Sequence, residues 1–316
     1  MDLSVVIPVY NEEMAVRPTI LEIQKELDKL DIEYEIIIVD DNSTDSSIER
    51  IKELDVKIIK HRRNFGGGVA RVNGMKYAAA PIILQTDADG TYPCDKIPEI
   101  LKEMETADMV IGARKYEKAK GFRPIRVLVK WLIKKFASYL SNADIPDLNT
   151  GLRAYRKDVA LRYEYLYPST HSIMSTMTLA FLIDKRRVKF VDIDYRKRRG
   201  ESSFHPIRDT YNYILATVRS ITYFYPLKIT TRLTFLFLLF GLILFVRDVF
   251  IFNLRDTTVL LLVVAVIVFL FGTMFDLLVS IRREINIGME RIRNYDEKKT
   301  QKDLLESDPN IEIIKE

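Results

Sequence analysis

The stretch that decides the fold is Pro81-Ile82-Ile83-Leu84-Gln85-Thr86-Asp87-Ala88-Asp89-Gly90-Thr91-Tyr92-Pro93. Its apolar beginning is typical of a buried strand, and glycine and proline turn the chain away after the acidic end. Residues i and i+2 of an extended segment point the same way, so Asp87 and Asp89 can face one ligand together. Two close carboxylates repel each other unless a cation or hydrogen-bond donors lie between them. The pair is either a solvated acidic turn or, at the carboxyl end of a sheet strand, a site for a divalent cation and a diphosphate.

The composition predicts a chain with a sizeable core. Of its 316 residues, 48% are hydrophobic and 29% are charged, which suits one large domain or two ordinary ones. The formal net charge of +4 is mild, and we expect no nucleic-acid partner. The single cysteine, Cys94, excludes an internal disulfide and suits a reducing compartment. We expect no cleavable signal peptide, because Met1 leads directly into a strand-like segment.

Strand-like and helix-like segments alternate through the first part of the chain. We expect helices at about 12–30, with Asn11 as a cap, after Asp45, and at about 69–79. The alternation predicts an α/β fold, a Rossmann-like, mostly parallel sheet with right-handed crossovers. The predicted strands are 3–8, 34–39, 56–60, the run that ends in Asp87, and 109–114.

Polar residues gather at the predicted carboxyl edge of this sheet, where α/β proteins bind ligands. Each of them also has a plain structural reading, as a cap, a tight turn or a surface charge. Their convergence on one edge favours a ligand site. The segments concerned are 8–12, 40–45, 66–68, 87–89 and Arg114.

The following part has a weaker pattern. Residues 125–140 read as a basic amphipathic helix, 145–151 as a loop, 152–155 as a strand, 171–182 as a helix and 188–195 as a further strand. Four basic residues, Arg196-Lys197-Arg198-Arg199, then precede a glycine. Such a run is either a solvated face or, beside an acidic metal site, a receptor for phosphate.

Two apolar runs, 229–246 and 257–281, approach or exceed the ~20 residues that cross a bilayer. The short segment between them predicts a helical hairpin, and a buried helical pair in a soluble protein is the alternative. Basic residues flank the hairpin, so the positive-inside rule predicts a multi-pass membrane protein whose catalytic domain faces the cytoplasm. The expected parts are a catalytic domain (1–204), an amphipathic interfacial helix (205–228), two transmembrane helices (229–281) and a cytoplasmic tail (282–316), partly disordered. The flanking residues are Lys228, Arg232, Arg282 and Arg283.

Several motifs, taken together, identify a family. The chain resembles the family-2 glycosyltransferases of the GT-A fold over roughly residues 3 to 226. The later segments resemble the polyprenyl-phosphate branch, to which dolichol-phosphate mannose synthases and undecaprenyl-phosphate glycosyltransferases belong. The motifs that carry the resemblance are Ser4-Val5-Val6-Ile7-Pro8-Val9-Tyr10-Asn11-Glu12, Val39-Asp40-Asp41-Asn42-Ser43-Thr44-Asp45, Asn64-Phe65-Gly66, Asp87-Ala88-Asp89, Asp147-Leu148-Asn149-Thr150-Gly151-Leu152-Arg153 and Gly200-Glu201-Ser202.

The resemblance implies roles for individual residues. Asp89, with Asp87 beside it, would bind Mg²⁺ or Mn²⁺, and Asp89, Arg114 and Arg198 would be catalytic. The residues implied to hold the nucleotide sugar, a GDP- or UDP-hexose, are Pro8, Tyr10, Glu12, Val39, Asp41, Asp87 and Ala88. Those implied to hold the acceptor phosphate are Arg114, Arg126 and Arg198.

The chain departs from the family pattern at three positions. Thr91 stands where many relatives have glutamine, Lys197 where they often have arginine, and Ser203 where lysine is usual. We therefore assign the phosphate role to the basic cluster, with Arg198 as its best single candidate.

The expected acceptor sets the expected chemistry. A phosphate monoester is largely ionised at neutral pH, so it can attack the anomeric carbon without a strong general base. The resemblance implies an inverting transfer to a polyprenyl phosphate. Two alternatives remain open. One is a transferase that acts on a hydroxyl of a glycolipid or polysaccharide, with Asp147 as the base, and the other is a non-catalytic nucleotide-sugar-binding membrane protein.

Overall fold

The computed structural model describes residues 1–115, 135, 138, 144–169, 172–198, 226–295 and 311–315. The chain divides into two compact units. The first comprises Met1–Thr217 and Lys298–Glu316, and the second comprises Val218–Glu297. Arg126, Arg199, residues 205–225 of the predicted interfacial helix and almost all of the predicted helix at 125–140 lie outside the described residues.

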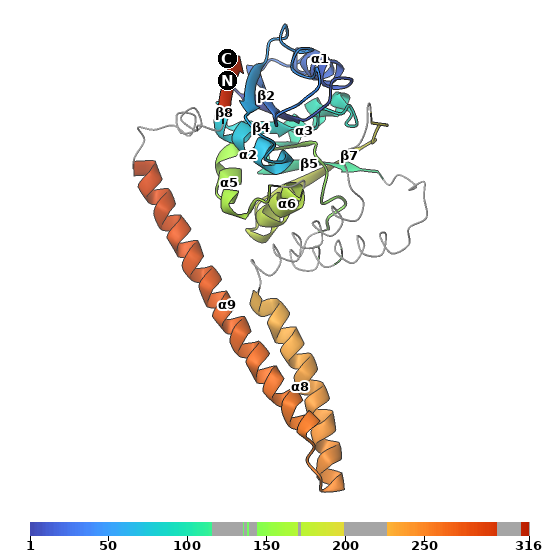
Figure 1. Ribbon diagram of the computed structural model, residues 1–316, viewed down its shortest axis with the longest axis vertical. Helices are drawn as coiled ribbons and strands as arrows, with labels where there is room; N and C mark the ends of the chain where they lie inside the picture. Colours follow the sequence, from blue (N-terminus) through green and yellow to red (C-terminus); the bar gives the residue numbers. More distant parts are fainter. Residues whose placement is uncertain are drawn as a thin grey trace. The chain divides into compact units, whose positions relative to one another are not determined.

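The first unit is built on an eight-stranded sheet with the order β7-β5-β6-β4-β1-β2-β3-β8 (Figure 1). β6 and β8 run antiparallel to their neighbours and the remaining pairs are parallel, which confirms the predicted mostly parallel α/β fold. The strands are β1 Leu3–Val9, β2 Tyr34–Asp40, β3 Lys57–His61, β4 Ile82–Gln85, β5 Met109–Arg114, β6 Arg153–Arg156, β7 Val188–Ile193 and β8 Ile311–Lys315.

Helices cover both faces of the sheet. In Figure 1, α1 and α3 lie on one face, and α2, α5 and α6 lie on the other. The helices are α1 Val16–Leu27, α2 Gly67–Tyr77, α3 Ile97–Glu103, α5 Lys157–Leu161 and α6 Ile173–Ile183, with short 3₁₀ turns at Cys94–Lys96 and Glu164–Leu166. Every residue of α6 is buried, and the predictions of helices near 69–79 and 171–182 are confirmed.

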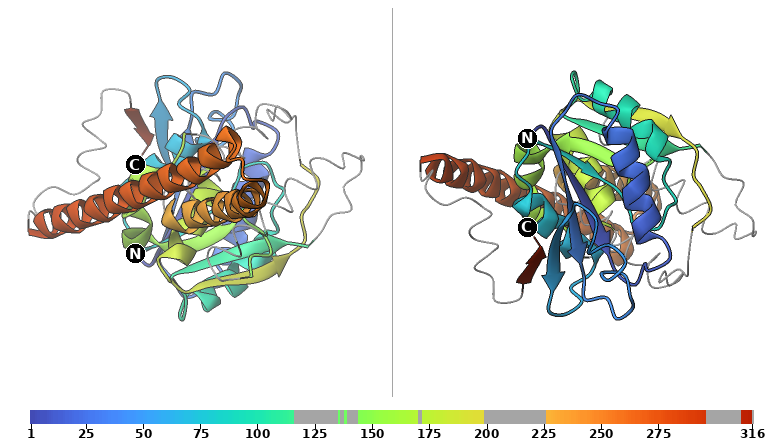
Figure 2. Two further views of the ribbon diagram at one scale, coloured as in Figure 1. Left: turned by 90° about the horizontal axis from the view of Figure 1, so that it is seen from below. Right: turned by 90° about the horizontal axis from the view of Figure 1, so that it is seen from above.

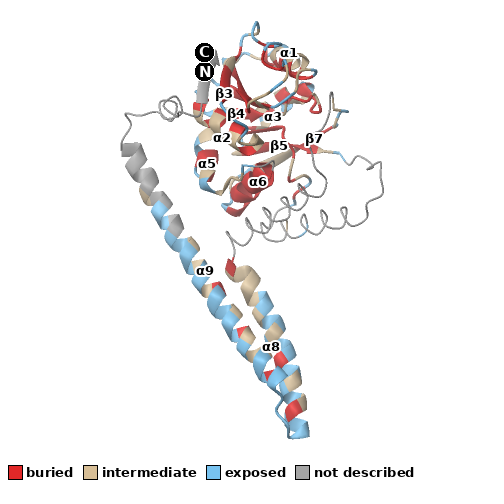
Figure 3. Cartoon of the chain, viewed as in Figure 1, coloured by how far each residue is buried: buried red, intermediate tan, exposed pale blue. Residues whose placement is uncertain are grey.

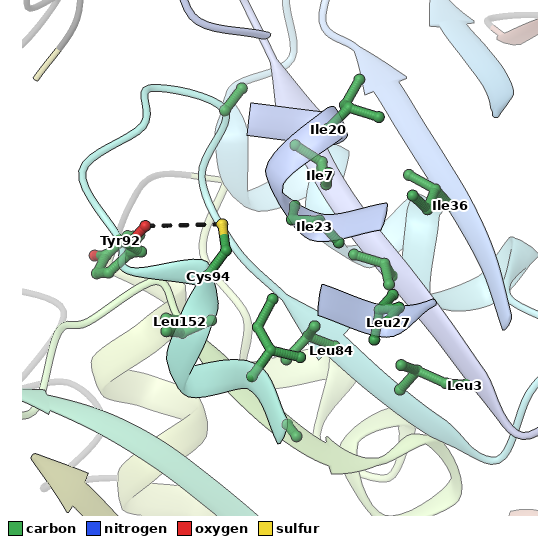
Figure 4. Close-up of a cluster of buried hydrophobic side chains, with 14 of the residues drawn as sticks. Leu3, Ile7, Ile20, Ile23, Leu27, Ile36, Leu84, Tyr92, Cys94 and Leu152 are labelled. Atoms are coloured by element: carbon green, nitrogen blue, oxygen red, sulfur yellow. Dashed lines mark hydrogen bonds between the residues drawn. The ribbon is translucent and has the colours of Figure 1, made fainter. Parts of the chain in front are cut away.

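The core between β1 and α1 holds the carboxyl edge of the sheet in place. Alternate residues of β1, such as Leu3 and Ile7, pack against Ile20, Ile23 and Leu27 of α1 (Figure 4). All five side chains are buried. Burial of an aliphatic side chain contributes roughly 1.5–3 kcal/mol to the free energy of folding. This cluster therefore stabilises the positions of the strand ends beside it.

Two predictions about the first helices are wrong. Asn11 does not cap α1, which begins at Val16 after Ala15 and has no side-chain cap. Asn11 instead adopts φ 55°. The segment after Asp45 forms successive turns rather than a helix, because its backbone bonds, such as Ile51 to Ile48, mostly close three-residue steps.

The end of the chain belongs to the sheet, although the sequence predicted a polar and partly disordered tail. β8 pairs antiparallel with β3, and Ile313 lies opposite Ile59 and Ile311 opposite His61. Figure 2 shows β8 beside β3 at the edge of the sheet. An uncovered edge strand exposes unpaired backbone groups, and β8 covers this one.

The second unit consists of two helices, α8 Pro226–Ile251 and α9 Asp256–Tyr295. Pro226–Ile251 and Asp256–Ile281 are each long and apolar enough to cross a membrane. Their apolar side chains are largely exposed (Figure 3), and Phe250, for example, is 80% exposed. This argues against a buried helical pair. Small residues line the contact between them, and a Cβ at Gly241 would lie 2.7 Å from Leu262 Cδ2.

Asp248 closes the turn of the hairpin. Its Oδ2 accepts hydrogen bonds from Thr258 Oγ1 at 2.6 Å and from the Arg255 backbone N–H at 3.0 Å. Arg247 pairs with Oδ1 at 2.6 Å. The acidic side chain at the end of α8 thereby satisfies a backbone donor at the start of α9.

Candidate active site

Two loops at the carboxyl edge are tied together by side-chain hydrogen bonds. Asn11 lies at their centre, since its N–H donates to Ser43 Oγ at 3.0 Å and its Oδ1 accepts from the Thr44 N–H at 2.8 Å. Glu12 N–H donates to Ser47 Oγ at 2.8 Å. The left-handed backbone of Asn11 is one that asparagine tolerates better than most residues. The network fixes Tyr10 and Glu12 above the ends of β1 and β2.

Arg198 joins two carboxylates that come from different loops. Its Nη2 donates to Glu12 Oε1, and its Nη1 lies 3.4 Å from Asp89 Oδ2. Burial raises the pKa of Glu12 to about 7 against the opposing effect of Arg198, and the charges of Asp89 and Asp87 add to the rise. The side chain of Arg198 is 28% exposed, and its buried Nε has no hydrogen-bond partner among the residues that the structure describes. Arg198 thus places a positive charge between Glu12 and Asp89 and reduces the repulsion between these two carboxylates.

Asp89 is held from its own turn. Thr91 donates to Asp89 Oδ1 twice, from Oγ1 at 2.5 Å and from the backbone N–H at 3.1 Å. Burial and the neighbouring Asp87 raise the pKa of Asp89, and the bonds from Thr91 lower it. Because Oδ1 is used within the turn, Oδ2 is the oxygen that faces Arg198.

Asp87 is held by a buried arginine. Arg71 Nη2 in α2 donates to Asp87 Oδ1 at 2.5 Å. Gly151 lies so close that a Cβ there would be 2.7 Å from Asp87 Oδ2. The Gly151 N–H donates to Tyr92 Oη at 2.7 Å, so the loop before β6 packs directly on the Asp87-Ala88-Asp89 turn.

Arg114 and Asp147 form an ion pair at the end of β5. Arg114 Nε donates to Asp147 Oδ2 at 2.6 Å and its Nη2 donates to Oδ1 at 3.0 Å. Burial opposes ionisation of Asp147, but the hydrogen bonds and charge of Arg114 outweigh it and lower the Asp147 pKa. The Arg114 guanidinium also lies over the ring of Tyr195, 5.3 Å from its centroid.

The loop that carries Asp147 is anchored from below by Arg153. This side chain is fully buried, and its Nε and Nη2 donate to the Thr150 carbonyl at 3.2 and 2.6 Å. Its Nη1 donates to the Met174 carbonyl in α6 at 3.0 Å. Burial lowers the pKa of Arg153 to about 10. The carbonyl cage therefore fixes the loop on the sheet.

The basic residues Arg196, Lys197 and Arg198 have different surroundings. Arg196 turns away from Asp89 and pairs with Glu22 at 2.9 Å and Asp95 at 3.1 Å. Lys197 is exposed, and only Arg198 reaches the acidic pocket among Arg196, Lys197 and Arg198. Of the remaining predicted ligand residues, Val39 and Ala88 are buried, Pro8 is half-buried, and Tyr10 is 41% exposed.

Comparison with known proteins gives the family. The model for "Glycosyl transferase family 2" matches residues 4–163, about half of the chain. The chain belongs to glycosyl transferase family 2.

This family-2 glycosyltransferase is similar to several curated proteins. It is 27% identical over 206 residues to the dolichyl-phosphate hexose transferase of Haloferax volcanii, covering 65% of this chain and 87% of the relative. It is 31% identical over 214 residues to the dolichol-phosphate mannosyltransferase of Pyrococcus furiosus, covering 64% and 59%. It is 25% identical over 223 residues to the dodecaprenyl-phosphate galacturonate synthase of Rhizobium johnstonii, covering 68% and 65%.

Solved structures support the fold. The chain aligns with glucosyl-3-phosphoglycerate synthase from Mycobacterium tuberculosis, with a TM-score of 0.54 and 17% identity, over 70% of this chain and 80% of that one. A second structure of the same enzyme, with TM-score 0.54 and 17% identity over 71% and 79%, contains Mn²⁺, UDP and glucosyl-3-phosphoglycerate. The predicted GT-A fold is confirmed.

The residues of the family-2 glycosyltransferase suit a hard divalent cation. Carboxylate oxygens are the donors that Mg²⁺ and Mn²⁺ prefer, and Asp87 and Asp89 meet beside each other with a raised pKa at Asp89. No group of three histidine, cysteine or acidic side chains that could hold a metal occurs in the described part of the chain. A cation here would therefore need oxygens from a substrate diphosphate and from water.

Sequence reasoning missed several side chains of the site. Arg71 carried no signal, because a single arginine in a helix reads as a surface residue. His61 was not singled out, because it lies just beyond the predicted strand at 56–60 and its contact with Asp41 joins positions 20 residues apart. Thr91 was noticed only as a departure from the family pattern, and the structure shows that its hydroxyl donates to Asp89 Oδ1.

Proposed function

We propose that this family-2 glycosyltransferase moves a hexose from a nucleoside-diphosphate sugar to the phosphate of a polyprenyl phosphate at a membrane surface. The observation that carries the proposal is the Arg114–Asp147 pair. Asp147 was the candidate base for a hydroxyl acceptor, but both of its oxygens accept from Arg114 and its pKa is lowered. A carboxylate held in this way is a poor proton acceptor, so an acceptor that arrives ionised fits the site better.

In the proposed reaction a phosphate oxygen of the acceptor attacks the anomeric carbon of the donor. The bond between this carbon and the diphosphate oxygen breaks, and the nucleoside diphosphate leaves with the electron pair. Because the attack comes from the side opposite to the leaving group, the anomeric centre is inverted. Asp89 and Asp87 would hold a divalent cation, which would supply neutralisation of charge on the departing diphosphate. Arg114, whose side chain is 32% exposed, would orient the acceptor phosphate with the N–H groups that Asp147 does not use.

Arg198 would act on the donor side. In this state it pairs with Glu12 and Asp89. Asp89 would hold a divalent cation in the donor complex, and Arg198 would then be free to donate to the donor phosphates. Arg126 remains a proposed third phosphate ligand by resemblance alone.

The hairpin would anchor the enzyme beside its lipid substrate. Exposed apolar residues along α8 and α9 suit a lipid environment. The chain leaves the catalytic unit before α8 and returns to it in β8, a strand of the same sheet. A hairpin that crosses the bilayer must therefore cross it twice, with both ends on the side of the catalytic unit. The flanking basic residues favour the cytoplasm for that side.

Transfer assays with the full chain in detergent test the proposal. Radiolabelled nucleotide sugars are offered with a polyprenyl phosphate, with the matching free polyprenol, or with a glycan acceptor. We expect label in the polyprenyl phosphate alone. Label in a hydroxyl acceptor would favour the glycolipid or polysaccharide alternative, and nucleotide-sugar binding without any transfer would favour a non-catalytic protein.

Two arginine variants give a matched control within that assay. Arg198→Ala removes the side chain that contacts Glu12 and Asp89, and Arg196→Ala removes an equal charge that pairs elsewhere. A lost charge-assisted hydrogen bond costs about 1.5–3 kcal/mol, hence roughly ten- to a hundredfold in rate. We expect this loss for Arg198→Ala and near-normal transfer for Arg196→Ala.

A further inference from the structure

The Arg114 guanidinium is held by the protein along one edge and over one face. Its Nε and Nη2 donate to the carboxylate of Asp147 at 2.6 and 3.0 Å, which fixes the edge. The face lies over the ring of Tyr195, with the Arg114 Cζ 5.3 Å from the ring centroid. The N–H groups that Asp147 does not take remain on the other edges of the group. These are the donors that Arg114 can offer to an acceptor phosphate.

The ring of Tyr195 is itself fixed by its neighbours. Tyr195 lies two residues beyond β7, the strand that pairs with β5 and with its last residue, Arg114. Its ring meets the ring of Tyr92 edge to face, with the centroids 5.5 Å apart and the planes at 72°. Tyr92 is buried, and its Oη accepts from the Gly151 N–H at 2.7 Å. Gly151 belongs to the loop that also carries Asp147, so the ring and the carboxylate that hold Arg114 are fixed together.

The segment around Tyr195 is also bound to the turn that carries Asp89. The Arg196 N–H donates to the Thr91 carbonyl at 2.8 Å. Thr91 in turn donates to Asp89 Oδ1 from its hydroxyl at 2.5 Å. The position of the Tyr195 ring, and with it the plane of Arg114, is therefore set relative to the carboxylates of the site. A transfer between two substrates requires such a fixed relation between the groups that hold them.

A ring at position 195 also fills space, because Tyr195 packs against the main hydrophobic cluster of the catalytic unit. The cation over its face adds an electrostatic contact that packing does not explain. The face of an aromatic ring carries partial negative charge and attracts a guanidinium, more strongly where water is partly excluded. Tyr195 is half-buried, and the side chain of Arg114 is 32% exposed. The attraction is therefore only partly screened.

We propose that Tyr195 is a positioning residue, whose ring face holds the Arg114 guanidinium in the plane that meets the acceptor phosphate. This inference rests on the proposed function and deepens it. Asp147 fixes the edge of the guanidinium and Tyr195 fixes its plane. The phosphate then meets donors that are already oriented, and the cost of ordering a long side chain on binding is reduced.

Steady-state transfer by the full chain in detergent tests the inference, with polyprenyl phosphate and nucleotide sugar varied in turn. Tyr195→Leu removes the ring, and we expect the KM for polyprenyl phosphate to rise about five- to tenfold while the KM for the donor changes less than about twofold. Tyr195→Phe keeps the ring face, and its acceptor KM should stay within about twofold of the wild type. Tyr34→Leu removes a ring that packs against the same cluster at the start of β2, and should leave both KM values unchanged.

A double-mutant cycle separates positioning from packing. Arg114→Gln removes the cation that lies over the ring. If Tyr195 acts through Arg114, adding Tyr195→Leu to Arg114→Gln should raise the acceptor KM by less than about a further twofold. A further rise of about five- to tenfold would show that Tyr195 acts without Arg114, and overturns the inference.

A fluorinated ring gives a second reading with almost the same side-chain shape. A trifluorinated phenylalanine at position 195 has a much less negative ring face than phenylalanine, so it attracts the guanidinium less. We expect its acceptor KM to move from the Tyr195→Phe value toward the Tyr195→Leu value, with the unfolding midpoint of Tyr195→Phe. An acceptor KM equal to that of Tyr195→Phe would mean that the ring acts by packing alone, which also overturns the inference.

The wild-type protein tells a failure of this inference from a failure of the proposed function. Wild-type transfer to polyprenyl phosphate, together with an unchanged acceptor KM in Tyr195→Leu, removes the inference and leaves the proposed function standing. Wild-type transfer to a hydroxyl acceptor and not to polyprenyl phosphate removes the proposed function and the inference with it.

Discussion

Arg114 and Asp147 are joined by two parallel hydrogen bonds, with Nε 2.6 Å from Oδ2 and Nη2 3.0 Å from Oδ1. The pair connects the end of β5 to the loop before β6. The planar fork of arginine matches a carboxylate in this geometry, and lysine cannot reproduce it. The carboxylate thus fixes the orientation of the Arg114 guanidinium, the proposed ligand of the acceptor phosphate.

The first prediction concerns this orientation. Asp147→Asn keeps the size of the side chain but removes the charge that holds Arg114, and we expect transfer to fall about tenfold. Arg114→Lys should fall at least as far, because the charge remains and the fork is lost. Initial rates at saturating donor and varied polyprenyl phosphate measure both. Asp144→Asn, an exposed acid three positions earlier, serves as the control. An inactive Asp147→Asn beside a near-normal Arg114→Lys would instead identify Asp147 as a base and favour a hydroxyl acceptor.

The second prediction concerns Glu12 and pH. Its pKa in the folded protein, about 7, lies above its ordinary value of 4.5. Between these values the folded state binds more protons than the unfolded state, so the free energy of unfolding decreases as pH rises from 4.5 to 7. Glu12→Gln removes this dependence.

Thermal unfolding of the metal-free protein at pH 5 and pH 8 measures the effect. We expect the unfolding midpoint of Glu12→Gln to exceed that of the wild type at pH 8 and to differ little from it at pH 5. Glu49→Gln, which removes an exposed acid, should behave as the wild type at both values. A Glu12→Gln variant that is less stable at pH 8 would show that the ion pair with Arg198 outweighs burial.

The third prediction uses a glycine as a spacer. A Cβ at position 151 would lie 2.7–2.9 Å from the carboxyl group of Asp87, the far end of a side chain that can turn. Gly151→Ala should therefore fold and still displace Asp87, and we expect transfer to fall about tenfold or more with little change in the unfolding midpoint. Gly288→Ala, where nothing lies within 4 Å, is the matched control. Normal transfer by Gly151→Ala would mean that Asp87 is not required in this position.

The fourth prediction concerns topology. Because β8 returns to the catalytic sheet, a reporter in the turn between α8 and α9, at 252–255, should lie across the membrane from a reporter after residue 316. Accessibility of the two reporters in sealed vesicles measures this. Deletion of the hairpin, residues 226–295, should release the catalytic unit from the membrane. Two reporters on one face would rule out the proposed crossing.

The sequence predicted those parts of the fold that depend on local pattern. β-branched runs such as 3–8 and 34–39 form buried strands wherever they are placed, and β1 and β2 lie within a residue or two of the prediction. The gathering of polar residues at the carboxyl edge follows from topology alone. The turns after Asp45 and the role of Asn11 were missed, because both depend on hydrogen bonds between two loops about 32 residues apart.

The side-chain pairs within the site could not be predicted from the sequence for the same reason. Arg71 meets Asp87 and Arg198 meets Glu12 only after helices and strands have packed, and the separation of the second pair is 186 residues. The composition of the tail was polar and acidic, yet five residues near its end, Ile311–Lys315, pair with an open sheet edge. Pairing partners of this kind carry no local signal.

The last prediction concerns the turn from Asp87 to Thr91, which follows β4. Thr91 donates to Asp89 Oδ1 from both Oγ1 and N, and Oδ2 alone faces the pocket. Thr91→Val keeps the shape of the side chain and removes the hydroxyl, so Asp89 loses a short hydrogen bond that orients it. We expect the affinity for Mn²⁺ in the presence of a nucleoside diphosphate, measured by electron paramagnetic resonance, to fall about tenfold. Thr91→Ser should restore most of it, because serine retains the donor. Equal or tighter Mn²⁺ binding by Thr91→Val would mean that Asp89 binds the cation better with both oxygens free.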